Sequence, residues 1–119
     1  MTGLAPEDVW LNGTVEGEMV ADRKFSLLRP ETIESLWYLY RLTGERKYKE
    51  WGWKIFEATE QHCKTEAGFT GVKDVTVMPP EHDDQMQSFF LAETLKVLGV
   101  CLFVRSPPRN SRPVPVVAV

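Results

Sequence analysis

The acidic side chains at the start of one predicted helix are the first candidates for chemistry. Glu31 and Glu34 are three residues apart and follow Arg29-Pro30, a spacing that places both carboxylates on one face of a helix. Two such acids can point into one cleft, and the neighbouring arginine can bind a hydroxyl-rich or anionic ligand. Acids in a first turn also simply favour the positive end of the helix dipole. Spacing alone favours this second interpretation.

Three other patterns have both a functional and a structural interpretation. The run Glu81-His-Asp-Asp84 offers oxygen ligands to a hard cation. It lacks the glycine and distal glutamate of an EF-hand loop, so a solvated loop that caps a helix is favoured. Trp37, Trp51 and Trp53 could form a platform for sugar rings, although aromatic residues at helical positions usually belong to the core. Asn12-Gly-Thr14 fits an N-glycosylation acceptor, a short pattern that often arises by chance.

Composition and charge argue against two classes of partner. The chain has 119 residues, enough for one small domain with a modest core. Its formal net charge of -3 argues against nucleic acid, because phosphate binding normally shows as a basic surplus. The longest apolar stretches are too short to cross a bilayer, and the first residues lack the features of a signal peptide. We therefore expect no nucleic-acid partner and no membrane segment in this chain.

Turn signals divide the chain into three helices and connecting segments. Residues 1–28 contain several glycines and little periodicity, which indicates mostly loop. A first helix begins at Pro30 and stops at Thr43-Gly44, and a second runs from about Arg46 to Cys63, forming an antiparallel hairpin with the first. The segment 64–84 reads as a long loop with a short strand or β-hairpin, and Asp83 or Asp84 is expected to cap a third helix.

The end of the chain has a different character from the rest. After Lys96 the sequence continues with a short apolar stretch and then the proline-rich run Ser106–Pro115. Proline cannot continue a helix, so residues 97–119 are predicted to form a disordered tail. We expect the structural domain to occupy residues 1–96.

One block of residues resembles a known family. Leu27–Ser35, Leu-Leu-Arg-Pro-Glu-Thr-Ile-Glu-Ser, is similar to the Arg-Pro-Glu-Thr-Val-Glu-Ser block of glycoside hydrolase family 47, the class I α-1,2-mannosidases. The opening Thr2-Gly-Leu-Ala-Pro-Glu7 resembles the family's preceding segment. Further matching stretches lie at 36–44, 51–56, 68–75 and 86–96.

This resemblance implies an all-α fold, namely a fragment of an (α/α)7 barrel with residues 1–96 as a partial catalytic domain. It also implies a glycosidase that removes terminal α-1,2-linked mannose from high-mannose N-glycans on glycoproteins, with inversion and dependence on Ca2+. The family implies a membrane-anchored enzyme on the lumenal side of the endoplasmic reticulum or Golgi.

The resemblance also implies roles for five residues. An inverting hydrolase needs one acid to protonate the departing oxygen and one carboxylate to activate water, and Glu31 matches the family's proposed catalytic base. Arg29 matches a substrate-contacting arginine, and Glu34 an acid that lines the site close to the calcium and its waters. Phe89 matches the ring that stacks on the terminal mannose, and Glu93 a carboxylate at the bottom of the same pocket.

The departures from the family pattern leave alternatives open. The family's direct calcium ligand is a threonine in a Phe-Asn-Thr-Glu-Ala-His-Pro motif, which does not occur after Lys96, so we expect no direct metal ligand here. The catalytic acid belongs to earlier helices of the family, so the isolated chain is expected to be inactive. The alternatives are a lectin-like relative that recognises misfolded glycoproteins for degradation, and a nonfunctional helical fragment. Trp51-Gly-Trp53 and Glu93-Thr94 resemble processing mannosidases more than the lectin-like relatives.

Overall fold

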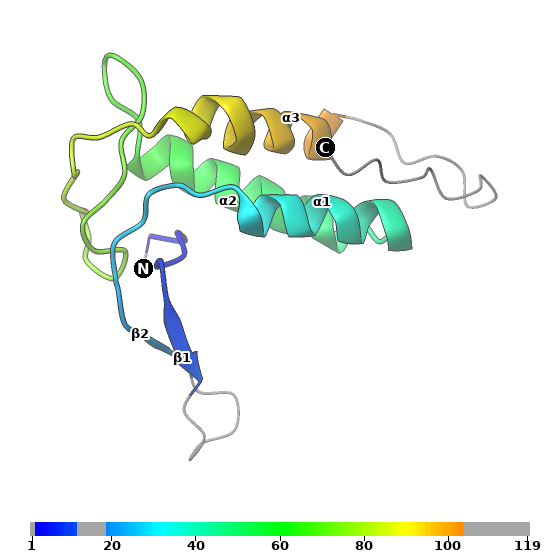
Figure 1. The fold of residues 1–119 in the computed structure, drawn as a ribbon, viewed down its shortest axis with the longest axis horizontal. Helices are drawn as coiled ribbons and strands as arrows, with labels where there is room; N and C mark the ends of the chain where they lie inside the picture. Colours follow the sequence, from blue (N-terminus) through cyan, green and yellow to red (C-terminus); the bar gives the residue numbers. More distant parts are fainter. Residues whose placement is uncertain (1, 12–18, 104–119) are drawn as a thin grey trace.

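The computed structural model describes residues 2–11 and 19–103, and helices make up most of this part of the chain. Two short strands come first, β1 (Val9–Leu11) and β2 (Met19–Ala21). The helices follow in the order α1 (Glu31–Thr43), α2 (Lys47–His62), the π-helical segment η1 (Phe90–Leu95) and α3 (Lys96–Phe103). α1, α2 and α3 all pack against one another, and the β-hairpin extends away from them (Figure 1). The expected all-α class is confirmed.

The start and stop signals of α1 act as the sequence predicts. Pro30 directly precedes the first turn, and Gly44 ends the helix with a left-handed φ of 71°. Its N–H donates to the carbonyl of Tyr40, which satisfies one of the carbonyls left free at a helix end. Ile33, Leu36 and Tyr40 form the buried face of the helix. Three or four residues separate them, so the apolar stripe of the sequence is the face that packs.

α2 packs through small residues, while its tryptophans remain exposed. The buried positions of α2 are Gly52, Ala58 and Thr59, and a Cβ on Gly52 would lie 3.8 Å from Sγ of Cys101 in α3. The absence of a side chain at Gly52 lets α3 approach closely at this point. Trp51 and Trp53 are 48% and 43% exposed, so the assignment of these two rings to the core is wrong.

The third helix begins later than expected and also ends later. Its first helical residue is Ser88, because Asp83 does not cap it: Oδ1 of Asp83 instead accepts hydrogen bonds from the Thr70 hydroxyl and the Gln85 amide. The helix continues without interruption through Lys96 into α3, where Leu98 and Cys101 are buried. The prediction of disorder is therefore wrong for residues 97–103, which are helical and bury Leu98 and Cys101. Residues 104–119 lie outside the described part.

The β-structure does not lie where the sequence suggests. In the described residues the paired strands are β1 and β2, which are antiparallel with Trp10 opposite Val20, within the segment expected to be mostly loop. The expected hairpin in 64–84 is replaced by isolated bridges that join Lys64 to Phe69, Ser26 to Val72, and Val72 to His82. A Cβ on Gly71 would lie only 2.6 Å from the Ser26 carbonyl oxygen, so the close approach of these two segments requires glycine. The Asn12–Thr14 pattern lies outside the described residues.

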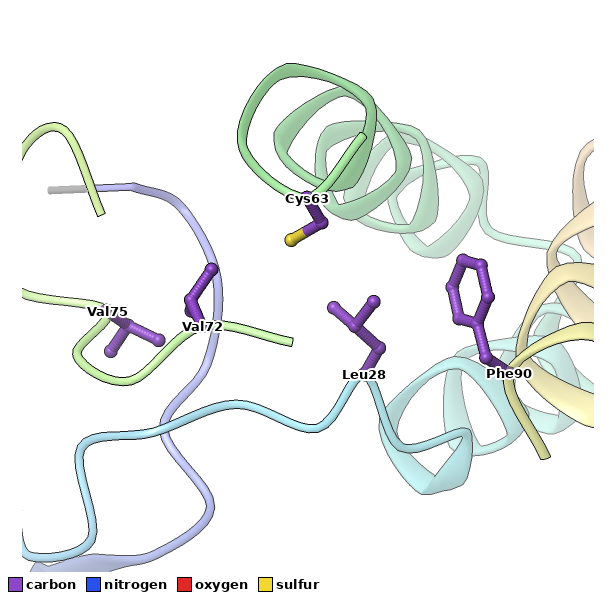
Figure 2. Close-up of a cluster of buried hydrophobic side chains, with 5 residues drawn as sticks. All are labelled: Leu28, Cys63, Val72, Val75 and Phe90. Carbon is purple, nitrogen blue, oxygen red and sulfur yellow. The ribbon is translucent and has the colours of Figure 1, made fainter. Parts of the chain in front are cut away.

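One buried cluster ties the long loop to the segment that leads into α1. It consists of Leu28, Cys63, Val72, Val75 and Phe90. Figure 2 shows Leu28 between Phe90 on one side and the two valines on the other. The ring of Phe90 also packs on that of Phe69, with centroids 5.0 Å apart. Because Leu28 is anchored from several directions, the residues that follow it enter α1 from a defined position.

Candidate functional site

The site is built on a sharp bend immediately before α1. Leu28 has a φ of 61°, a left-handed conformation that a non-glycine residue adopts only when its surroundings impose it. The burial of its side chain is one such constraint. Another is the hydroxyl of Thr94, in η1, which donates a hydrogen bond of 2.7 Å to the Leu28 carbonyl. This hydrogen bond therefore links the bend to the π-helical segment, directly before Arg29 in the sequence.

Arg29 connects the bend to the third helix through its side chain. Its guanidinium carbon lies 5.5 Å from the centroid of the Phe89 ring, a distance within the range of cation–π attraction. Nε donates a hydrogen bond of 2.6 Å to Oε2 of Glu7. This hydrogen bond and the negative charge of Glu7 raise the pKa of Arg29, with a smaller contribution from Glu31. The side chain is a permanent cation stacked on an aromatic ring.

Glu7 is a site residue that the sequence reasoning missed. Oε1 of Glu7 accepts a hydrogen bond of 2.9 Å from the Leu27 amide, while Oε2 accepts from Arg29. Its side chain is only 10% exposed. The resemblance of Thr2–Glu7 to the family was a signal at this position. Periodicity could not have found it, because Glu7 and Arg29 are 22 residues apart in the chain.

Glu31 lies beside a hollow between the N-terminal segment and the helices. The hollow has a volume of about 860 Å3, and its lining includes Glu7, Arg29, Glu31, Ile55 and Thr94. Most of the lining surface is apolar, with the charged groups near the start of α1. A concave, mostly apolar surface with a few polar groups is the usual composition of a small-molecule site.

The structure brings together only some of the five predicted site residues. Arg29 contacts Phe89, and Arg29 and Glu31 line the same hollow. Glu34 is exposed in the first turn of α1 and Glu93 is exposed on η1. Neither of these two acids forms a hydrogen bond or ion pair through its carboxylate with Arg29, Glu31 or Phe89 in the described residues.

The acidic run at residues 81–84 is occupied by structural contacts. Glu81 pairs with Lys73, and the His82 ring nitrogen Nε2 lies 2.9 Å from the His62 carbonyl oxygen. Across residues 2–11 and 19–103, no group of three or more His, Cys, Asp or Glu side chains is placed to hold a metal ion. The same part of the chain contains no helix with the length and apolar character needed to cross a membrane.

Comparisons with known proteins agree with this helical fold. Residues 1–99 match the family described as glycosyl hydrolase family 47. The chain belongs to this family. It is 50% identical over 96 residues to mannosyl-oligosaccharide 1,2-alpha-mannosidase IB of Homo sapiens, covering 80% of this chain and 15% of that protein. It is also 50% identical over 97 residues to mannosyl-oligosaccharide 1,2-alpha-mannosidase MNS1 of Arabidopsis thaliana, covering 82% of this chain and 17% of the relative.

A solved structure supports the arrangement of the elements. The alpha-1,2-mannosidase from Trichoderma reesei matches with a TM-score of 0.69 and 34% sequence identity, over 74% of this chain and 18% of that chain. The packed helices are thus consistent with a part of the helical barrel of that protein. The chain spans 15–17% of the length of the two relatives above.

Proposed function

We propose that this chain contributes one wall of the active site in a glycosidase that removes terminal α-1,2-linked mannose from high-mannose N-glycans. The supporting observation is the start of α1, where Glu31 and Arg29 line one hollow and Arg29 stacks on Phe89. Membership in a glycosyl hydrolase family supports hydrolysis of a glycosidic bond as the reaction at this site. The relatives are named as mannosidases, which favours hydrolysis over a role limited to recognition.

The proposed reaction assigns a separate task to each side chain. Glu31 acts as general base: it takes a proton from water while the water oxygen attacks the anomeric carbon and the glycosidic bond breaks with inversion. A general acid protonates the departing oxygen, and no described residue is assigned that role. Arg29 donates hydrogen bonds to sugar hydroxyls.

The other predicted contacts belong to the same proposal. Phe89 offers ring surface to the apolar face of the terminal mannose. Glu34 and Glu93 accept hydrogen bonds from water and from sugar hydroxyls at the edge of the site. Their exposure on α1 and η1 leaves both carboxylates accessible to such partners.

Calcium is proposed for the complete enzyme and not for this chain alone. Ca2+ prefers six to eight oxygen ligands, and the described residues place no three acidic side chains together. They do not fit a complete calcium site, and no described side chain is assigned as a direct ligand. We place the enzyme on the lumenal side of the endoplasmic reticulum or Golgi, membrane-anchored, because its proposed substrates are glycoproteins that pass through these compartments.

The proposal is tested by grafting residues 1–96 into the corresponding segment of the human relative and measuring mannose release from a high-mannose N-glycan. We expect the graft to be active and Glu31→Gln to lower kcat by about 10²- to 10⁴-fold, the usual contribution of a general base. Glu50→Gln is the matched control, because Glu50 is an exposed acid in the first turn of α2. We expect it to leave the rate unchanged.

Two results would contradict this function. A folded graft without activity would remove the chain from the mannosidase reaction, and full activity of Glu31→Gln would remove Glu31 from the role of base. The 119-residue chain assayed alone is expected to release no mannose. The family resemblance implies that the general acid belongs to other helices, and the reaction needs that acid to protonate the departing oxygen.

A further inference from the structure

Glu7 joins two segments that are distant in sequence at the bend before α1. Its two carboxylate oxygens are used separately: Oε1 accepts from the Leu27 amide at 2.9 Å, and Oε2 accepts from Nε of Arg29 at 2.6 Å. These two donors flank Leu28, the residue with the left-handed φ of 61°. Glu7 therefore holds the bend from both sides of its strained residue.

Glu7 is itself held in place by its backbone. Its amide donates to the carbonyls of Arg23 and Phe25, at 3.1 and 2.9 Å, so the segment before β1 is fixed against the segment after β2. With 10% of its side chain exposed, the carboxylate is shielded from much of the competing water. A mostly buried acid on a fixed backbone is suited to orient a flexible arginine.

We infer that Glu7 is a positioning residue that sets the direction of the Arg29 side chain, a role that rests on the proposed function. A guanidinium has five N–H donors in a rigid fork. The contact through Nε occupies one edge of this fork, so the terminal N–H groups remain for sugar hydroxyls. The Phe89 ring supports the plane of the guanidinium at 5.5 Å. Glu7 thus fixes which edge of Arg29 is presented to the site.

The alternative role for Glu7 is purely structural, through the Leu27 amide alone. The variant Glu7→Gln separates the two roles, because an amide side chain has one oxygen that can still accept from Leu27 while its NH2 group cannot accept from Arg29. Asp8→Asn is the matched control. Asp8 forms an exposed ion pair with Arg23 one position further along the chain, so this variant removes the same charge without touching Arg29.

The test is NMR of the full 119-residue chain labelled with 15N-arginine, with the Arg29 signals assigned from Arg29→Lys. The readouts are hydrogen exchange at Arg29 Nε–H and the upfield shift that the Phe89 ring induces in the Arg29 side chain. In Glu7→Gln we expect the exchange to accelerate by about twofold to fivefold, as for the loss of a partly exposed ion pair. The ring-induced shift should decrease, while the Leu27 amide stays protected. Asp8→Asn should change none of these signals.

Three results would overturn the inference: Arg29 signals that are the same in Glu7→Gln and the unaltered chain, equal changes in Asp8→Asn, or loss of protection at Leu27 only. If Glu7→Gln fails to fold, a comparison within the unaltered chain still tests the inference. Its Arg29 Nε–H must exchange more slowly than that of Arg41, whose guanidinium lies 5.2 Å from the Trp37 ring centroid. Equal exchange rates would refute the inference. These readouts require no catalysis, so failure of the proposed function would appear in the graft assay and not here.

Discussion

At the scale of single residues, the site depends on polar groups that hold a strained backbone. The positive φ of Leu28 persists because its side chain is buried and its carbonyl is bonded to Thr94. Thr94 is 5% exposed, so its hydroxyl is shielded from water and the bond to Leu28 has few competitors. Removing it would leave a buried carbonyl without this partner, and a buried polar group without a partner destabilises the fold.

We predict that Thr94→Val lowers the free energy of unfolding by about 1–3 kcal/mol, the cost of an unsatisfied buried polar group. Valine has nearly the same shape as threonine and lacks the donor. Urea denaturation of the chain measures the change, and Thr94→Ser, which keeps the hydroxyl, is the control. If Val and Ser lower the stability equally, packing and not the hydrogen bond accounts for the role of Thr94.

A second residue-scale prediction concerns Cys63, which is a free thiol, as is Cys101. Burial raises the pKa of the Cys63 thiol from 9.0 to about 12, and the charge of Asp83 acts in the same direction. Above pH 9.0 the unfolded thiol loses its proton while the folded one keeps it, so this contribution to stability is complete below pH 9.0 and is lost as the pH rises to about 12.

The free energy of unfolding should therefore fall less steeply in Cys63→Ala than in the unaltered chain between about pH 8 and about pH 10. Denaturation with urea at the two pH values measures the difference. Parallel loss of stability in both proteins would mean that the Cys63 thiol does not resist ionisation in the folded state.

At the scale of secondary-structure elements, the end of α1 follows local chemistry, whereas the helix start at Ser88 follows contacts with other segments. Gly44 ends α1 because only a left-handed residue lets the chain turn there, and its N–H satisfies the Tyr40 carbonyl. Asp83 and Asp84 look like helix caps in the sequence. The Asp83 carboxylate accepts hydrogen bonds from Thr70 and Gln85, and Asp84 has a φ of 60°, which is not helical. The helix therefore begins further along the chain, at Ser88.

Two glycine substitutions compare a position at a helix end with a position inside a helix. Gly44→Ala should destabilise the chain by about 1–2 kcal/mol, because an L-residue at φ 71° is strained. Gly99→Ala lies inside α3 and should stabilise it by up to about 1 kcal/mol through helix propensity. Neither new Cβ would have an atom within 4 Å, so backbone conformation alone sets the sign. Thermal unfolding of both variants measures it, and changes of the same sign would contradict the argument.

At the scale of the whole molecule, large apolar side chains remain on the surface of the helical layer and the hairpin. Leu42 is 77% exposed and Trp10 67%, in addition to Trp51 and Trp53 on α2. Where such side chains form a contiguous patch, the patch usually marks a contact with another surface. Family membership and the match to a helical barrel are consistent with this exposure.

We predict that the purified 119-residue chain self-associates in a concentration-dependent way, because these side chains gain from leaving water. Sedimentation velocity over a range of protein concentrations measures this, and the double variant Trp51→Gln with Trp53→Gln should shift the balance toward monomer. Lys54→Gln, an exposed position on the same helix, is the control. A monomer at every concentration would show that the exposed rings do not drive association.

Features that depend on near neighbours in the chain can be read from the amino-acid sequence alone. The helices α1 and α2, the glycine stop at Gly44 and the acids of the first turn of α1 all follow from local propensity and spacing. The family could also be inferred from the run Leu27–Ser35, because its order of residues is specific. Glu31 and Arg29 were candidates for the same reason.

Features that join distant segments become visible only in the folded chain. The pairing of Glu7 with Arg29, the bond from Thr94 to Leu28 and the loop bridges of Val72 each close a contact between residues at least ten positions apart. No periodic pattern encodes such contacts, because their stability depends on burial and geometry that the complete packing creates. The same packing extends the last helix through residues 97–103, where the proline-rich end of the chain predicts a disordered tail.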